Sequence, residues 1–429
     1  MDNNKQSLRI LHASTKDISG GAARSAYRLH KALLDLGHDS SMLVAQRQSS
    51  DPSVKAFNPS RDPSKRLVRF LRRGMAALRS RHFKNPKLPI YELFSDDRSQ
   101  YGAEVLEQMG TYELINLHWI AGFIDYKSFF TKITKKSRIV WRLSDLNAFT
   151  GGCHYDNGCG RYKTGCGACP QLNSQKRRDL SYQIWQRKKA LFSLLNSRQL
   201  HIVAQSYWMA KEVNSSPLLH DFPVTVIANG CDTSIFSPRD PSEARAAFEI
   251  PQDALVVLFV ADSIVSSRRK GFELMSKVLS GMHGMANLYF VSLGKIVPSL
   301  HLDFPHLHLG HISNDRLLSL VYSAADVYVI PSIQDNFPNT VLESLSCGTP
   351  VVGFEVGGIP EMVRPGITGL LAKSGDVDSL RYEIVNLLQD SAKRAEISTN
   401  CRIIAEKEYA IETQTKRYVA LYREILADT

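Results

Sequence analysis

The sequence lacks the long apolar runs with which proteins cross membranes. No stretch of about 18 or more apolar residues occurs in its 429 residues, so a transmembrane helix is not expected. The first residues, MDNNKQSLRILHAS, lead into a strand without the apolar core of a signal peptide. Repeats at the periods of solenoid proteins are also missing. We therefore expect a cytoplasmic protein, peripheral on the inner face of the cytoplasmic membrane if it meets a membrane.

Strands and helices alternate along the chain. At 43% hydrophobic residues, a chain of this length can bury two cores. A strand over 8–13, a glycine-bearing loop, a helix over 22–36 and a strand over 41–45 form a βαβ pattern. Further strands are expected over 112–119, 137–143, 200–206, 224–230, 254–262, 287–294, 307–312, 326–332 and 349–354. This order predicts an α/β protein with two doubly wound, mainly parallel sheets.

The boundary between the two domains is expected near NGCDTSIFSPRDPSEA, where prolines and turn-forming residues cluster. We place a first domain at 1–232 and a second at 233–404. A last helix, roughly over 405–427, belongs to a C-terminal segment at 405–429.

Positive charge is concentrated in one segment. The formal net charge is +11, and residues 61–87 hold ten Lys or Arg against one acid, Asp62. Apolar residues recur at helical spacing within the insert 61–88, which predicts a helix that is basic on one side and apolar on the other. Such a helix suits an anionic membrane surface. The alternative is a surface helix with a solvated basic face. Nucleic acid is not expected, because interleaved aromatics and a recognised binding motif are missing.

Four of the seven cysteines lie in the loop 151–172, GGCHYDNGCGRYKTGCGACPQL. A cytosolic location argues against disulfides, and four close thiols can form a tetrahedral zinc site. We therefore predict a possible structural zinc bound by Cys153, Cys159, Cys166 and Cys169, with His154 as a substitute for one thiol. The scattered Cys231, Cys347 and Cys401 are expected to be buried.

Two carboxylates flank a turn in PSIQDNFPNTVLESLSCG. Asp335 follows the strand expected over 326–332, and Glu343 lies on the next helix, expected over 339–348. Ligands of open α/β sheets bind at the carboxyl ends of strands. The amides of Asn339, Thr340 and Val341 can hold an anion at the start of that helix, and Glu343 can accept hydrogen bonds from a ribose diol. The alternative is a core strand and helix with two solvated acids.

This segment resembles the Glu-x7-Glu signature of the retaining nucleotide-sugar glycosyltransferases of family 4, with Asp335 in place of the first Glu. The segments PNTVLESLSCGTPVV, GGIPEMV, GITGLL and IANGCDTSIFSP are also similar to the family. The resemblance implies the GT-B fold, in which two Rossmann-like domains face a cleft and the last helix packs back on the first domain. It covers nearly the whole chain and is strongest over 254–372.

The resemblance also implies roles for single residues near the donor. Gly20 and Gly21 would lie near the diphosphate, although a Gly-Gly pair is more often a tight turn. Lys270 matches the Lys-Gly that holds the diphosphate, whereas the usual Arg position is Val265 here, so Arg269 or Arg268 must supply that charge. The alternative for RRKG is a solvated turn.

Three further roles complete the expected site. The expected catalytic residues are His118, Lys270 and Asp335. His118 would reach the donor sugar, and Asp335 would bind sugar hydroxyls. The alternative for His118 is a buried histidine whose hydrogen bonds are made within the core. Asp145 would face the acceptor. No Asp-x-Asp motif stands at a strand end, so catalysis is expected to need no metal cofactor.

The resemblance implies a metal-independent, retaining transferase of hexosyl type that moves a sugar from a nucleotide-sugar donor to a glycan acceptor. A similar FTGGCHY…CPQL block occurs in transferases that build bacterial surface polysaccharides. This favours a polyprenyl-diphosphate-linked acceptor in exopolysaccharide, capsule or lipopolysaccharide synthesis. Two alternatives remain: a zinc-stapled, non-catalytic basic scaffold that binds anionic lipid or nucleic acid, and an enzyme of the same fold with a soluble sugar acceptor.

Overall fold

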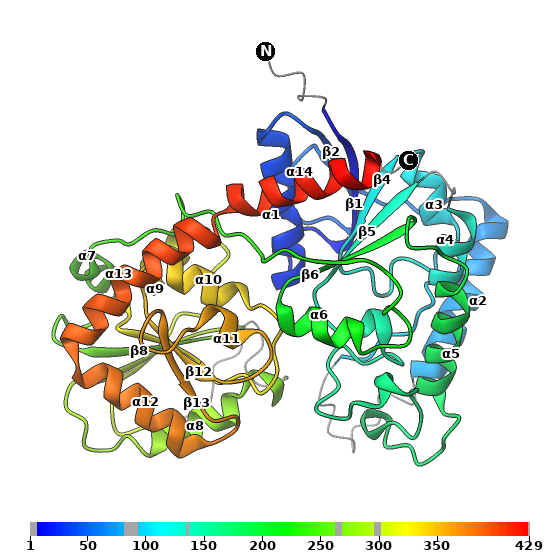
Figure 1. Ribbon diagram of the computed structural model, residues 1–429. Helices are drawn as coiled ribbons and strands as arrows, with labels where there is room; N and C mark the ends of the chain where they lie inside the picture. Colours follow the sequence, from blue (N-terminus) through cyan, green and yellow to red (C-terminus); the bar gives the residue numbers. More distant parts are fainter. Residues whose placement is uncertain (1–6, 81–92, 134–136, 262–267, 296–301, 428–429) are drawn as a thin grey trace. The chain divides into compact units, whose positions relative to one another are not determined.

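A computed structural model describes residues 7–80, 93–133, 137–261, 268–295 and 302–427. The chain forms two compact units, one made of Met1–Ile227 with Thr415–Thr429 and the other of Ala228–Gln414. Each unit is a parallel sheet with helices on its faces (Figure 1). The predicted fold class, two Rossmann-like α/β domains, is confirmed.

The first unit contains a seven-stranded sheet within the described residues, in the order β3-β2-β1-β4-β5-β6-β7. Its strands are β1 Arg9–Lys16, β2 Asp39–Gln46, β3 Val54–Ala56, β4 Leu114–Leu117, β5 Arg138–Leu143, β6 Leu200–Ala204 and β7 Val224–Val226. Its helices are α1 Gly21–Asp35, α2 Pro63–Ser80, α3 Glu104–Met109, α4 Tyr126–Lys132, α5 Leu180–Phe192, α6 Tyr207–Asn214 and α14 Ile411–Ala427. The edge strand β3 was not predicted, and only Val54 of its three residues is buried.

The central strand β4 explains how this sheet is covered on both faces. All four of its residues are buried, and successive side chains point to opposite faces. Ile115 and Leu117 pack into one core, whereas Leu114 packs into a second core that contains Tyr418 and Tyr422 of α14. From Thr415 on, the C-terminal helix is therefore part of the first unit.

The second unit contains a six-stranded sheet in the order β10-β9-β8-β11-β12-β13 within the described residues. Its strands are β8 Leu255–Val260, β9 Leu288–Leu293, β10 His306–His308, β11 Val327–Ile330, β12 Val351–Phe354 and β13 Gly369–Ala372. Its helices are α7 Pro241–Ala247, α8 Phe272–Ser280, α9 Asp315–Ala324, α10 Asn339–Ser346, α11 Ile359–Met362, α12 Val377–Gln389 and α13 Ser391–Glu408. None of the helices described in either unit is long and apolar enough to span a membrane.

The predicted helix over 405–427 is wrong as a single helix. It comprises the end of α13 and the whole of α14, with a break at Tyr409 and Ala410. At the break the Cys231 amide donates to the Tyr409 carbonyl at 2.8 Å, and the Ile411 amide donates to the Cys231 carbonyl at 2.9 Å. These bonds lie within the second unit and hold the end of α13 there. The chain leaves the first unit at 227/228, where we expected 232/233. It returns to the first unit at 414/415, where we expected 404/405.

Candidate functional site

Several predicted donor-binding residues lie at the carboxyl end of the second sheet. Strands β8, β11 and β12 are adjacent and parallel, so their carboxyl ends lie at the same edge. Arg269 and Lys270 belong to a 3-10 turn between β8 and α8, and Asp335 lies between β11 and α10. Val265 lies outside the described residues.

Asp335 pairs with two cations at this edge. Lys270 Nζ lies 2.7 Å from Asp335 Oδ2, and an Arg269 guanidinium nitrogen lies 3.2 Å from the same oxygen. Burial alone would raise the pKa of Asp335, but the charges of Lys270 and Arg269 hold that pKa below its usual value. The Lys270 side chain is 32% exposed, so one cation remains accessible. Two cations against one carboxylate leave a net positive charge, which suits a diphosphate.

Two glycines let the backbone close around this cluster. Gly357 has φ +56°, and a Cβ atom there would lie 1.8 Å from the Asp335 carbonyl oxygen. Gly271 has φ +75°, and its Cβ would lie 1.8 Å from the Pro331 carbonyl oxygen. Only glycine fits at positions that combine a left-handed backbone with such close approach. The loop after β12 and the turn before α8 are thereby held against the segment that carries Asp335.

Glu343 is buried on α10, at 4% exposure. Its carboxylate accepts a hydrogen bond from the Tyr322 hydroxyl at 3.3 Å. The prediction of an unpaired amide at Val341 is wrong, because this amide already donates to the Pro338 carbonyl at 3.1 Å. The side chains of the other two residues have partners: Asn339 accepts from Asn229 at 3.1 Å, and Thr340 accepts from the Tyr328 hydroxyl at 2.8 Å.

His118 is buried in the first unit, at 2% exposure. Its Nε2 lies 2.8 Å from His12 Nδ1, so one ring donates to the other. Burial, with Arg142 nearby, lowers the pKa of His118 well below its usual value, and burial likewise lowers the pKa of His12. His118 Nδ1 and His12 Nε2 have no hydrogen-bond partner among the described residues. The arrangement matches a core histidine, and contact with a sugar stays a prediction.

Gly20 and Gly21 form the exposed start of α1. Gly20 has φ +89° and open space where a Cβ would lie, so glycine is required there by backbone conformation rather than by crowding. The buried Arg142 of β5 donates to the Ala22 carbonyl at 2.9 Å and supports this turn. Contact of the two glycines with a diphosphate stays a prediction.

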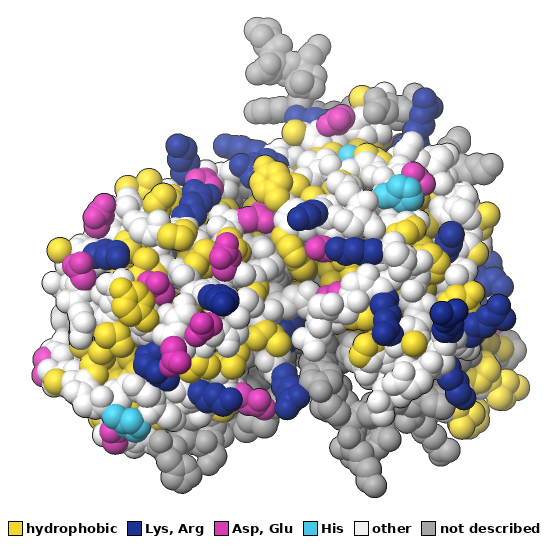
Figure 2. Space-filling view, turned by 60° about the horizontal axis from the view of Figure 1, so that its bottom comes forward, with side chains coloured by type: hydrophobic (Ala, Val, Ile, Leu, Met, Phe, Trp, Pro, Cys, Tyr) yellow, Lys and Arg dark blue, Asp and Glu magenta, His cyan; other side chains and the backbone are white. Residues whose placement is uncertain are grey.

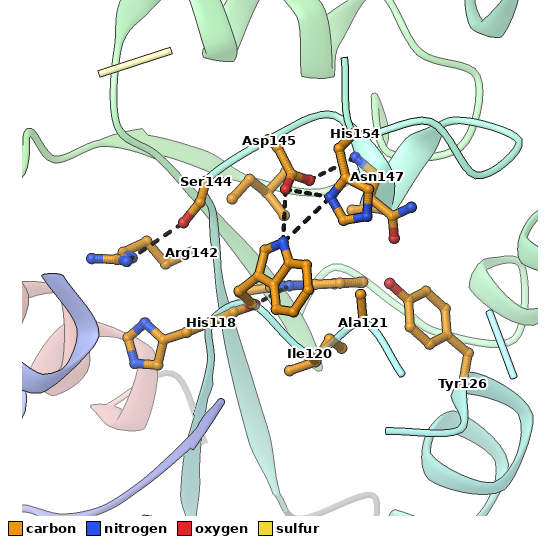
Figure 3. A pocket seen from close by; sticks show the side chains of 13 residues that line it. His118, Ile120, Ala121, Tyr126, Arg142, Ser144, Asp145, Asn147 and His154 are labelled. Atoms are coloured by element: carbon orange, nitrogen blue, oxygen red, sulfur yellow. Dashed lines mark hydrogen bonds and ion pairs between the residues drawn. The ribbon is translucent and has the colours of Figure 1, made fainter. Parts of the chain in front are cut away.

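Asp145 lines a pocket of about 260 Å³, its open mouth included, in the first unit (Figure 3). Asp145 Oδ2 lies 2.6 Å from His154 Nδ1 and accepts a hydrogen bond from Trp119 Nε1 at 2.9 Å. His154 Nε2 lies 2.8 Å from Ser95 Oγ. Burial alone would raise the pKa of Asp145, but His154 and three hydrogen bonds lower it. The His118 ring points away from Asp145 and His154 (Figure 3).

The sequence did not predict the Asp145–His154 pair or the role of Trp119. Position 144 is Ser, which excludes a histidine beside Asp145 in sequence, yet the cysteine-rich loop supplies one from nine residues away. The only sequence signal was His154 itself, which the spacing of the cysteines suggested as a zinc ligand. Arg142 was also missed, although an Arg flanked by apolar residues inside a strand is a recognisable signal of a buried polar contact.

The four cysteines of loop 151–172 line one pocket as free thiols. Burial raises the pKa of Cys153 well above its usual value and that of Cys166 to about 12. In the part of the chain that the structure describes, no group of three or more His, Cys, Asp or Glu side chains is arranged to hold a metal ion. The zinc site stays a prediction. Cys231, Cys347 and Cys401 are buried, as predicted.

Comparisons with known proteins agree with the donor-side features. Residues 254–390 match the family model described as Glycosyl transferases group 1. The chain is 28% identical over 213 residues to D-inositol 3-phosphate glycosyltransferase of Mycolicibacterium paratuberculosis, which is 48% of each chain. The chain thus spans about half the length of the curated relatives it matches.

Solved structures are similar over nearly the whole chain. Sucrose-phosphate synthase from Thermosynechococcus elongatus has a TM-score of 0.67 at 19% identity, and covers 98% of this chain and 100% of its own. Anabaena Alr3699/HepE in complex with UDP-glucose has a TM-score of 0.66 at 17% identity, and covers 97% of this chain and 100% of its own. The chain therefore has the GT-B fold, and its residues 254–390 resemble the glycosyl transferases group 1.

Proposed function

We propose that this protein is a glycosyltransferase that moves a sugar from a nucleotide-sugar donor to a glycan acceptor. The cluster of Arg269, Lys270 and Asp335 carries the proposal. It lies inside the stretch that matches Glycosyl transferases group 1, at the edge where open α/β sheets bind ligands. A solvated turn would not bring two cations onto one buried carboxylate.

The reaction breaks the bond between the anomeric carbon of the sugar and a diphosphate oxygen. Negative charge develops on the leaving diphosphate, and fixed cations stabilise it. Lys270 and Arg269 supply these charges in our proposal, with Asp335 holding both in place, and Glu343 accepts hydrogen bonds from the ribose. The acceptor oxygen bonds to the anomeric carbon while its proton passes to the leaving phosphate on the same face. The configuration is then retained, and the two cations serve where other transferases use a metal ion.

We place the acceptor at the pocket of Asp145 and His154. A carboxylate that is already ionised and oriented can accept a hydrogen bond from an acceptor hydroxyl. His154 belongs to the FTGGCHY…CPQL loop, and this supports a polyprenyl-diphosphate-linked glycan of exopolysaccharide, capsule or lipopolysaccharide synthesis. A soluble acceptor is the second candidate, because one relative is named for D-inositol 3-phosphate.

The test is a thermal-shift panel of UDP-, GDP-, ADP- and dTDP-linked sugars with EDTA present. We expect one base class to raise the melting temperature of the wild type. Lys270→Gln should weaken binding of that donor at least about tenfold, because a charge-assisted hydrogen bond contributes roughly 1.5–3 kcal/mol. Lys277→Gln is the matched control, since Lys277 is exposed on α8 and its substitution changes the net charge equally.

The outcomes separate the candidates. A shift that survives EDTA and is lost in Lys270→Gln alone supports the donor site and metal independence. No shift with any donor would overturn the proposal in favour of the non-catalytic scaffold. With a donor identified, transfer to lipid-linked or to soluble acceptors distinguishes the two acceptor classes, and NMR of the product gives its anomeric configuration.

A further inference from the structure

Helix α2 packs on the first unit with its basic side. Within the helix, among side chains described up to Leu78, only Lys65, Arg69 and Arg72 are partly buried. Lys65 Nζ lies 2.7 Å from a carboxylate oxygen of Glu107, and Arg69 pairs with the buried carboxylate of Glu104; both acids belong to α3. The usual arrangement, in which the apolar face of a surface helix is buried, is therefore reversed here.

The apolar side of α2 is exposed. Its large apolar side chains are between 46% and 72% exposed: Leu67, Val68, Phe70, Leu71, Met75 and Leu78. Most of them recur at spacings of three and four, so they form one face of the helix. At the right edge of Figure 2, on the side where α2 lies in Figure 1, Lys and Arg side chains gather beside hydrophobic ones.

Charge borders this apolar face. Arg66 and Arg73 are exposed and lie one turn to either side of Phe70, at one margin of the face. Residues 63–80 contain no Asp or Glu, so the helix carries only positive charge. A partner of α2 must therefore be apolar where the face lies and anionic along its border.

We propose that α2 lies in the interface of an anionic lipid bilayer, with its apolar face among the acyl chains and its border arginines at the phosphates. Interfacial helices bury their apolar face about 5–10 Å deep and reach anionic headgroups with Lys and Arg. This proposal stands on α2 alone and not on the proposed function.

Two other partners fit the helix less well. A nucleic acid would bind the basic side, but Lys65 and Arg69 on that side are already paired with α3. A second copy of the chain would bring two uniformly positive helices together, and like charges repel. A bilayer offers acyl chains to the apolar face and anionic phosphates to the arginines at its border.

Vesicle flotation of the full chain tests the proposal. We expect the wild type to float with phosphatidylcholine vesicles that contain phosphatidylglycerol, and less with phosphatidylcholine alone or at high salt. Phe70→Ser with Leu71→Ser should lower the bound fraction at least about tenfold on the anionic vesicles, because two inserted apolar side chains are lost. Arg66→Gln with Arg73→Gln should lower it by roughly tenfold, since each basic residue near the surface contributes to binding.

Leu194→Ser with Tyr382→Ser is the matched control, because these side chains are exposed to a similar extent outside α2, at 64% and 67%. We expect it to float like the wild type. Phe70→Trp gives a second readout, a blue shift of its emission when anionic vesicles are added. Retained flotation of the Phe70→Ser, Leu71→Ser variant, no flotation of the wild type, or a dimer that this variant abolishes would overturn the proposal. Binding of the wild type to duplex DNA but not to vesicles would do the same.

Discussion

Lys270 Nζ lies 2.7 Å from Asp335 Oδ2, although the two residues are 65 positions apart in the chain. The parallel pairing of β8 with β11 brings the segments after these strands to one edge of the sheet. The pairing of the strands therefore brings the two side chains together, and it places the cationic Lys270 at the edge of the sheet.

Asp335→Asn should lower the stability of the second unit. The substitution leaves Lys270 and Arg269 close together without a counter-ion. We expect the free energy of unfolding to fall by about 2 kcal/mol, below the full cost of breaking a buried pair because Lys270 is partly exposed. Urea denaturation at neutral pH measures the change. Asp303→Asn, at a carboxylate that is 51% exposed and also hydrogen-bonded, should change stability far less. An equal effect of both substitutions would contradict the prediction.

The stability of the protein should fall in mild acid. Burial lowers the pKa of His12 and His118 well below the usual 6.5, and that of His30 to about 4. These rings stay neutral in the folded state while the unfolded chain takes up protons below pH 6.5. Stability is therefore full above that pH and is lost as the pH falls below it, by up to about 1.4 kcal/mol per pH unit for each ring.

Urea denaturation at pH 7.5 and 5.5 measures this loss. His12→Asn should reduce the dependence on pH, because one buried ring is removed. His220→Asn is the control substitution at a histidine whose ring is half exposed rather than buried. A wild type equally stable at both pH values would show that these rings are protonated in the folded state.

Asp145 and His154 should be energetically coupled. Their charge-assisted contact is 2.6 Å long, and both side chains are largely buried. A double-mutant cycle with Asp145→Asn and His154→Gln should give a coupling of about 1–2 kcal/mol in the free energy of unfolding. His283 and Asp303 form a matched pair at 2.7 Å, with both side chains more than half exposed. Their coupling should be much smaller, and equal couplings would show that burial does not strengthen the Asp145 pair.

Two tyrosines of α14 should differ in their response to loss of the hydroxyl. The Tyr422 hydroxyl accepts a hydrogen bond from the buried Asn116 side chain at 2.6 Å. Tyr422→Phe should cost about 1–2 kcal/mol, because it leaves a buried amide donor without its partner. Tyr418 is buried equally, but its hydroxyl has no hydrogen-bond partner among the described residues. Tyr418→Phe should therefore be neutral or stabilising. Thermal and urea melts of both variants measure the difference, and the reverse order would refute it.

The cysteine-rich loop should contain zinc if the predicted structural site forms. Purified protein would then hold about one zinc per chain by elemental analysis, and the loss of that zinc on Cys166→Ser would locate it. Cys401→Ser is the control, because Cys401 is buried in the core of the second unit, whereas the loop belongs to the first unit. Protein without zinc, in which the four loop thiols react with a thiol reagent only after unfolding, would contradict the prediction.

Much of the donor edge could be predicted from local sequence patterns. The alternation of strands and helices, with turn residues between them, placed Lys270 and Asp335 in loops after strands and Glu343 on a helix. Among the strands that the structure describes, β3 and β13 were missed: β3 has one buried residue, and β13 begins with glycine, which is depleted in strands. The Val341 amide was predicted wrongly, since the local turn that pairs it with Pro338 has no sequence signature.

Contacts between distant segments could not be predicted in the same way. The sequence showed that His154 and Asp145 lie near each other in the chain but not that their side chains meet, because the path of an irregular loop depends on its own packing. The break before α14 had the same cause: Cys231 pairs with the backbone at Tyr409 and Ile411 from a segment far earlier in the chain.

Helix α2 shows the division between sequence and tertiary structure most directly. Its sequence alone determined that it is amphipathic and basic, because these properties follow from residue types at helical spacing. Which face meets the protein was decided by the tertiary structure, through Glu104 and Glu107 of α3, which pair with the basic side. Periodicity describes one helix at a time, whereas its orientation depends on the charges of the element against which it packs.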